Sequence, residues 1–465
     1  PETVDPALNT AIDASNIILH AFETLLTFDE NNDIVPGQAE SFDVSDDGLT
    51  YTFHLRDGLK WSDGSDFTAE DFVYSWKRLA DPMTAAPYAA DMLSMVKGYE
   101  EAAAGDIDAL AVSAPDAKTL VVELASPCVY FDKIITHASM APVKKDVVDA
   151  NGDQWALAPE TYVSNGPLKM IEWVPGSHMT FAKNENYWNA DKVTLNSLKF
   201  VLMEDSNAAY SAYQTGEVQM IKDIPTEEIP SLQDSPDYHL DPRLATSYTI
   251  FNTQKAPFDN AKVRMALSLA VDREYVANTL MIGTVAPATN FVGPGISDVE
   301  AGSSFEEVTR ANNGGDFFNA GYNKPVAEYL QSAWKDLGIT MDIKIVEWST
   351  FTPTRRAGDF EICRGGWVYD YDDPSNMLNL LASTSGNNDG KYSNPEVDKL
   401  LEEARSTADK AEHYEKLHAA ENLIMEDAAV SPLVYSSDFY LQNPKLKGTW
   451  HSPYGYWYFM YATME

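Results

Sequence analysis

A short run of charged, glycine and aromatic residues near position 370 has the composition of a binding site. Arg364 and two glycines precede Trp367, and three acids follow at Asp370, Asp372 and Asp373. A few placed charges among aromatic side chains are typical of ligand pockets, and glycines let another backbone approach closely. The run fits equally well a surface loop in which Arg364 neutralises the acids, and composition does not separate these two interpretations.

Other candidate sites are weaker. The chain has no G-x-S-x-G, H-E-x-x-H, Walker or dinucleotide glycine motif. His413 and His418 share a predicted helix but are five residues apart, which places them on different faces. Residues 29–40 carry acids at several positions of a calcium loop, but Ile34 stands where that loop needs glycine. We therefore expect a polar hairpin loop there, no metal site and no cofactor.

Composition narrows the class of protein. The 465 residues include 33 Lys plus Arg and 71 Asp plus Glu, a formal charge of −38. Such a surface repels phosphate backbones, so nucleic acid is not an expected partner. No apolar run approaches the roughly 18–20 residues that cross a bilayer. Cys128 and Cys363 are predicted to be buried thiols, with one long-range disulfide as the alternative.

Periodicity predicts mixed α/β structure. Residues 51–55 alternate as a strand, and Thr68 with Asp71 forms a capping box for a helix that ends at Asp81-Pro82. Asp259 or Asn260 caps a second helix. Apolar stripes predict further helices at 326–337, 397–404 and 414–424, and the strict alternation at 339–345 predicts a half-buried strand. No linker is visible, so we expect domains built from interleaved segments.

Several segments, in the right order, resemble the signature of the extracellular solute-binding proteins of the peptide/nickel type. They are YTFHLRDGLKWSDG at 51–64, TAEDFVYSW at 68–76, SNGP at 164–167, NENYW at 184–188, APF at 256–258, VRMAL at 263–267 and AVDR at 270–273. Residues 80–88 and 366–374 look most like the oligopeptide-binding members. So many spaced matches are hard to reach by chance.

The resemblance implies an α/β, two-lobed, periplasmic-binding-protein-like fold of class C (type II), with an extra inserted domain and a ligand cleft between lobes that close by hinge motion. Domain I would combine residues 1–22, 161–247 and 437–465. Domain II, the insertion, would hold residues 23–160, and domain III residues 248–436. Chain crossings between lobes would explain the missing linker.

The resemblance also implies roles for individual residues. Asp370 matches the aspartate that pairs with a peptide's α-ammonium group, and Arg364 and Arg355 match arginines that face the ligand, Arg364 being one that can meet a peptide carboxylate. Gly366 and Val368 match positions whose backbone pairs with the ligand backbone. Ligand-contacting aromatic positions are matched by Trp348, Trp367, Tyr248 and Tyr88.

The sequence departs from the family in three places. Thr10 stands where oligopeptide-binding members have a ligand-contacting glutamate, and Ala245 and Val368 replace a cysteine pair that some members bridge. The stretch 313–324 looks short, because typical members carry a helix, a strand and a histidine there. Peptide-length preference is therefore left open.

Partners follow from the resemblance. We expect short peptides as ligand, two ABC permease subunits with their ATPases, and a monomer that meets the membrane only through a lipid anchor absent from this chain. Sparse cysteine use favours a cell-surface lipoprotein of a monoderm bacterium over a periplasmic protein. The sequence does not distinguish nutrient uptake from signalling.

The sequence is also compatible with two other functions. The same fold can bind another cargo, namely an oligosaccharide, a metal chelate or a peptide signal, although Asp370 and Arg364 favour peptides. A secreted peptidase or glycosidase would need a paired catalytic group, and no carboxylate pair stands out beyond the Asp370 cluster. We therefore predict a binding protein rather than an enzyme.

Overall fold

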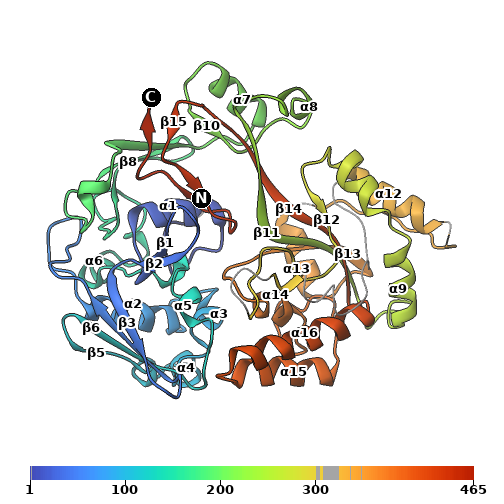
Figure 1. Cartoon of the computed structure of the whole chain (residues 1–465), viewed down its shortest axis with the longest axis horizontal. Coiled ribbons are helices and arrows are strands. Elements are labelled where there is room, and N and C mark those ends of the chain that lie inside the picture. Colours follow the sequence, from blue (N-terminus) through green and yellow to red (C-terminus); the bar gives the residue numbers. More distant parts are fainter. Residues whose placement is uncertain (2, 300–303, 307–323, 336, 347) are drawn as a thin grey trace. The chain divides into compact units, whose positions relative to one another are not determined.

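The computed structural model describes residues 1, 3–299, 304–306, 324–335, 337–346 and 348–465, with only the backbone of 324, 325, 348 and 349. The chain forms two compact units (Figure 1). Unit 1 comprises Pro1–Pro225 and Leu441–Glu465, and unit 2 comprises Thr226–Tyr440. The chain thus leaves unit 1 and returns to it, which confirms the interleaving. The finer division into three domains stays a prediction, and almost all of 313–324 lies outside the described residues.

Unit 1 is built on a four-stranded sheet of order β3-β4-β6-β5 and a three-stranded sheet of order β7-β8-β9. Its helices are α1 (Ile12–Ala21), α2 (Ala69–Ala80), α3 (Ala89–Leu93), α4 (Tyr99–Ala103), α5 (Phe131–Ile134), α6 (Lys145–Asn151) and α7 (Ser206–Gln214). Its strands are β1 (Leu26–Phe28), β2 (Ile34–Pro36), β3 (Ala39–Val44), β4 (Thr50–Leu55), β5 (Val112–Asp116), β6 (Thr119–Glu123), β7 (Leu168–Val174), β8 (His178–Lys183), β9 (Ser197–Val201), β10 (Met220–Ile221), β15 (Leu446–Lys447), β16 (Trp450–His451), β17 (Trp457–Tyr458) and β18 (Thr463–Met464).

Helix α2 forms as its sequence predicts. The Asp71 carboxylate accepts the backbone N–H of Thr68 at 2.8 Å and closes the capping box. Phe72, Trp76 and Leu79 are all buried on one face. The predicted hairpin is also confirmed, because residues 29–33 connect the antiparallel strands β1 and β2.

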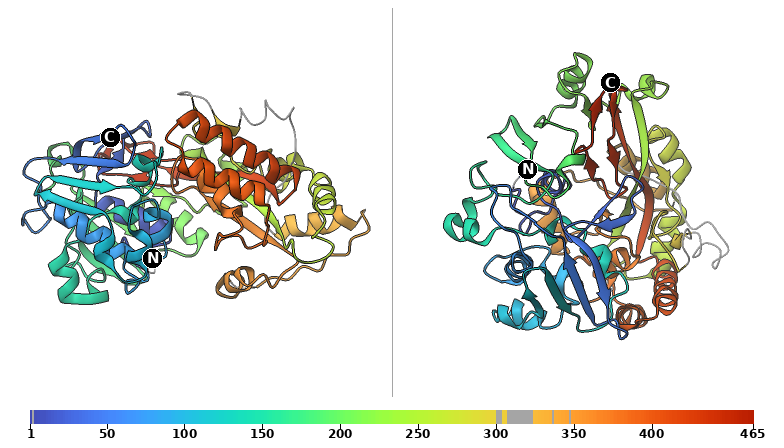
Figure 2. Two further views of the ribbon diagram at one scale, coloured as in Figure 1. Left: turned by 90° about the horizontal axis from the view of Figure 1, so that it is seen from below. Right: turned by 60° about the vertical axis from the view of Figure 1, so that its left-hand side comes forward.

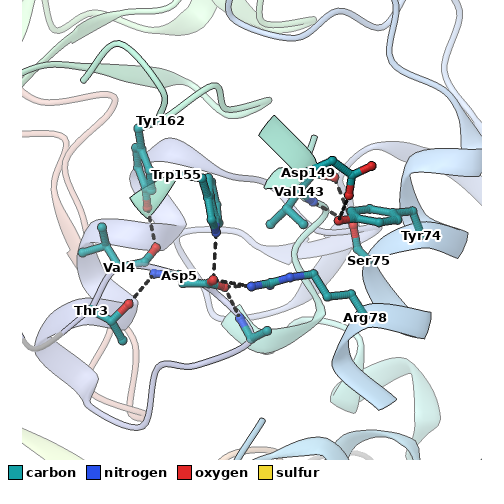
Figure 3. A network of polar contacts seen from close by, with 11 residues as sticks. Thr3, Val4, Asp5, Tyr74, Ser75, Arg78, Val143, Asp149, Trp155 and Tyr162 are labelled. Atoms are coloured by element: carbon teal, nitrogen blue, oxygen red, sulfur yellow. Dashed lines mark hydrogen bonds and ion pairs between the residues drawn. The ribbon is translucent and has the colours of Figure 1, made fainter. Parts of the chain in front are cut away.

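A buried charge network ties the N-terminal segment to α2 (Figure 3). The Asp5 carboxylate, 2% exposed, accepts both terminal nitrogens of Arg78 at 3.0 and 2.6 Å. It also accepts the indole N–H of Trp155 at 2.8 Å and the backbone N–H of Ala7 at 3.0 Å. Burial acts to lower the pKa of Arg78, but the hydrogen bond and charge of Asp5, together with Tyr74 and Asp153, raise it above its ordinary value. Every carboxylate oxygen is therefore engaged, which offsets the cost of burying the charge.

The buried histidine of α1 makes this unit sensitive to acid. Nδ1 of His20 donates to Asn16 O at 2.6 Å and Nε2 accepts Phe459 N–H at 3.0 Å, so the ring is neutral. Burial lowers the pKa of His20 to about 4, and that of His137 likewise. An unfolded histidine titrates near pH ~6.5. The contribution of neutral His20 to the free energy of unfolding is therefore complete above that pH and is lost as the pH falls toward 4.

We expect His20→Gln to flatten this pH dependence. Glutamine supplies a donor and an acceptor but does not titrate, so the variant is less stable at neutral pH and converges on the native protein in acid. The pKa shift of His20 corresponds to about 3 kcal/mol. Urea unfolding across this pH range measures the difference, and two parallel stability profiles would contradict the assignment.

Unit 2 contains the long strands β11 and β14, the green and dark red arrows of Figure 1, in a sheet with β12 and β13. Its strands are β11 (Tyr238–Phe251), β12 (Ala286–Pro287), β13 (Ile362–Val368) and β14 (Val430–Gln442), whose last residues reach unit 1 and pair there with β10. Its helices are α8 (Ile229–Leu232), α9 (Ala261–Leu269), α10 (Arg273–Tyr275), α12 (Lys324–Lys335), α13 (Trp348–Arg356), α14 (Ser375–Leu378), α15 (Pro395–Ser406) and α16 (Lys410–Glu426).

The predicted helices of this unit are confirmed. Asn260 caps α9 by accepting the N–H of Lys262, and the apolar stripes of α15 and α16 are buried where these helices pack side by side (Figure 2). The stripe of α12 contributes Val326, Leu330 and Trp334 to the core, whereas Leu337 lies beyond the helix and is 48% exposed.

The predicted strand at 339–345 is wrong. Within the described ranges this segment joins no sheet, and Ile345 is 73% exposed. Ile339 and Met341 still pack against the core around Trp334. Alternation therefore identifies the core-facing side chains only at the start of the segment, and a strand also needs a neighbour to take its backbone hydrogen bonds.

The cysteine prediction is confirmed only in part. Both residues are thiols, and Cys128 is buried, whereas Cys363 is only partly buried. Cys363 lies on β13, one of the strands that carry the predicted site. Among the described residues, none of the helices combines the length and apolarity needed to cross a bilayer.

Candidate ligand-binding site

Strand β13 offers the backbone of three predicted residues at an open edge. In the described sheet β13 pairs with β11 on one side and has no neighbour on the other. Tyr369 N donates to Leu244 O at 3.0 Å, and Asn252 N donates to Glu361 O at 2.9 Å, so these two pairs exchange hydrogen bonds. Hydrogen-bonded and non-hydrogen-bonded pairs alternate along an antiparallel ladder.

It follows that residues 363, 365 and 367 face β11. The N–H and C=O groups of Arg364, Gly366 and Val368 point away from it, toward the open edge. Gly366 and Val368 are the residues whose backbone was predicted to pair with a ligand, and the register gives them the orientation that this role needs.

One face of this ladder is lined by small side chains. Ala245 lies opposite Val368 and Ser247 opposite Gly366, so these four residues share a face. Ala245 and Val368 are also the positions that replace a cysteine pair in the resemblance, and their direct opposition fits that match. Above them is a pocket of about 280 Å³. Its lining residues are Arg243, Ala245, Thr246, Ser247, Phe351, Arg355, Arg364, Gly365, Gly366, Trp367, Val368 and Ser436.

Asp370 lies just beyond β13 and is positioned by Asn376. Asn376 Nδ2 donates to the Asp370 carboxylate at 3.3 Å, while Asn376 Oδ1 accepts the Asp370 backbone N–H at 3.3 Å and the Trp367 indole N–H at 3.0 Å. One buried amide thus orients both an aromatic ring and a half-buried carboxylate. Sequence reasoning missed Asn376, although its place six residues after Asp370 in the same loop is a usable signal.

The other two acids of the cluster are engaged elsewhere. The Asp372 carboxylate accepts the backbone N–H of Ser297 at 2.8 Å. Asp373 is fully buried and accepts His413 Nε2 at 3.0 Å, and His413 Nδ1 donates to the Ala404 carbonyl. These contacts hold loops and helices together, so within the cluster the predicted binding role remains with Asp370 alone.

Two pocket arginines differ in their surroundings. Arg355 on α13 forms an ion pair with Asp389 at 2.8 Å, and its guanidinium lies 5.5 Å from the Phe351 ring. Arg364 on β13 is exposed. Both line the pocket, as their predicted roles require.

The aromatic residues do not all gather at the pocket. Trp367 lines it, but Tyr248 is 6% exposed and packs edge-to-face on Phe291 at 4.9 Å. Burial raises the pKa of Tyr248. A Cβ on Gly365 would come within 2.5 Å of the Tyr248 ring, which explains the glycine at that position. Tyr248 therefore supports β13 from the opposite face.

Neither Tyr88 nor Trp348 is among the described residues that line the pocket. Tyr88 belongs to unit 1, where its ring lies 5.1 Å from that of His137. Trp348 begins α13, but its side chain lies outside the described residues. Their ligand-contacting roles stay predictions.

Comparison with known proteins places this geometry in a family. The profile of the bacterial extracellular solute-binding proteins, family 5 (middle), matches residues 33–314 and 317–389. The periplasmic oligopeptide-binding protein OppA of Salmonella typhimurium is 34% identical over 481 residues, 96% of this chain and 87% of the relative. The probable deoxycholate-binding periplasmic protein YgiS of Escherichia coli is 33% identical, over 98% of this chain and 90% of the relative.

A solved structure agrees with this match. The crystal structure of Haemophilus influenzae OppA in complex with RPPGFSPFR superposes with a TM-score of 0.82 at 30% identity, covering 100% of this chain and 97% of that chain. The predicted two-lobed, periplasmic-binding-protein-like α/β fold is thereby confirmed. The chain belongs to the bacterial extracellular solute-binding proteins of family 5.

Proposed function

We propose that this chain is the substrate-binding subunit of an ABC importer and that it captures short peptides. The observation that carries the proposal is the open edge of β13: the residues with outward backbone groups line a pocket that contains arginines, and the strand is followed directly by Tyr369 and the carboxylate of Asp370. Closure of the two lobes over the ligand would complete the capture.

Backbone pairing supports a peptide as ligand. An extended peptide that adds to a sheet edge receives main-chain hydrogen bonds whatever its side chains are. The groups of Arg364, Gly366 and Val368 supply such bonds at every second residue. Gly366 has no side chain, so the middle of the three outward positions stays open between Arg364 and Val368.

Charge anchoring supports recognition of both peptide ends. We assign the α-ammonium group to Asp370, held by Asn376, and a carboxylate to Arg364 or Arg355. Charge-assisted hydrogen bonds are roughly twice as strong as neutral ones and add direction. A steroid acid such as the ligand that the YgiS description names has no ammonium group for Asp370, which favours the peptide.

The proposed role also includes partner proteins and a location outside the cytoplasm. Family members are binding proteins, and we propose that this chain likewise acts without catalysis, as a monomer that delivers peptide to two permease subunits and their ATPases. We place it outside the cytoplasm, either lipid-anchored at a cell surface or in a periplasm.

The proposal is tested by native mass spectrometry of gently purified protein, followed by sequencing of whatever denaturation releases. We expect short peptides of mixed sequence, and a single defined peptide would indicate a signal receptor. Added peptide at about 100 times Kd should stabilise the emptied protein by about 2.7 kcal/mol. A released sugar, steroid or metal complex, or an unchanged melting temperature with peptide pools, would overturn it.

A further inference from the structure

The pocket has a third arginine that the family resemblance did not assign. Arg243 on β11 lines it together with Ser436 of β14. Its Nη1 forms an ion pair with Asp438 Oδ1 at 3.2 Å, and both side chains are mostly buried, with 22% and 19% exposed. Its Nε–H is buried and has no hydrogen-bond partner in the described part of the protein. Most of the five N–H donors of this guanidinium thus have no acceptor there.

The pocket around Arg243 is cationic. The described residues that line it include three arginines and no aspartate or glutamate, in a chain with 71 acids. Asp438 and Asp389, which form ion pairs with Arg243 and Arg355, are not among the lining residues. A guanidinium with spare, planar donors in such a pocket matches a carboxylate better than a neutral or cationic group.

Strand geometry brings a ligand group to this place. A peptide on the open edge of β13 directs every second side chain to the face that carries Ala245, Ser247 and Gly366. β11 is then two strand spacings away, about 10 Å. Arg243 lies on this face two residues before Ala245, so the register places it opposite Asp370. A glutamate-sized side chain that crosses Val368 beside Ala245 can therefore extend toward Arg243.

We propose that Arg243 is a specificity-determining residue that binds a carboxylate of the peptide within this pocket. The carboxylate comes either from an acidic side chain or from the C-terminus of a short peptide. This inference rests on the proposed function, since it names which peptides the same site prefers.

The test compares short alanine peptides in which one residue is glutamate or glutamine, each as a free acid and as a C-terminal amide, by isothermal titration calorimetry. We expect one carboxylate-bearing peptide to bind about tenfold more tightly than its neutral partner. Arg243→Gln should reduce this ratio to about one. Arg405→Gln, on exposed α15, is the matched control and should keep it.

The outcomes are separable. If Arg243→Gln abolishes the affinity ratio between glutamate and glutamine peptides, the bound carboxylate belongs to an acidic side chain. If it abolishes the ratio between free-acid and amide peptides, the bound carboxylate is the C-terminus. Equal losses for all peptides in Arg243→Gln would overturn the inference and indicate a structural role with Asp438. If that variant does not fold, Asp438→Asn should increase the carboxylate preference, and an unchanged ratio would overturn it. Failure of every peptide to bind would instead overturn the proposed function.

Discussion

Asp370→Asn is expected to weaken binding of a free-amine peptide by about 30- to 150-fold. The substitution keeps the shape of the side chain and its contact with Asn376 but removes the charge that pairs with an ammonium group. Losing one partner of such a pair costs about 2–3 kcal/mol, because the other charge remains partly buried without compensation. Calorimetric titration with one peptide, free or N-acetylated, measures the effect.

The acetylated peptide makes the test specific. It lacks the ammonium group, so Asp370→Asn should change its affinity little. Asp372→Asn is a matched control from the same loop, because Asp372 bonds to Ser297, and it should leave the ratio between the two peptides unchanged. An equal loss for both peptides in Asp370→Asn would remove the amine-anchoring role and leave β13 pairing as the main source of affinity.

Asp5→Ala is expected to lower the free energy of unfolding of unit 1 by about 3–5 kcal/mol. The substitution leaves Arg78 as a mostly buried cation without its partner, and it removes the acceptor of the Trp155 indole (Figure 3). Because Arg78 and Trp155 are buried, both losses are large. Urea unfolding followed by tryptophan fluorescence measures the change.

A double-mutant cycle isolates the pair. Arg78→Met combined with Asp5→Ala removes both charges, so the double variant should lose less than the sum of the single losses. Glu123→Ala breaks the exposed pair with Lys97 and should have little effect. Additive losses in the cycle would show that Asp5 and Arg78 are energetically independent.

The sequence predicted what is local and missed what depends on distant partners. The capping box and apolar spacing of α2 are specified within a dozen residues, so the local sequence is enough to predict this helix. The strand at 339–345 failed because pairing is not encoded in alternation. The roles of Asp372 and Asp373 were hidden because Ser297 and His413 lie far away in the chain.

The site shows the same division. Gly366 and Val368 were identified through the resemblance, and the register then explains why these and not their neighbours qualify. Arg243 was missed because its presence in the pocket follows from the pairing of β11 with β13, which joins positions more than 100 residues apart. Asn376 was missed because its side chain acts through Asp370 and Trp367 rather than by a recognisable motif.

The open edge of β13 has a consequence for the protein between cargoes. An unpaired strand edge is a template on which any other chain can build, including a second copy or a partly unfolded protein. Here the edge is interrupted by two consecutive glycines and carries the charge of Arg364, features that shorten and weaken a strand as a template. The formal charge of −38 also keeps copies apart. The same few residues of β13 thus favour pairing with short peptides while discouraging self-association.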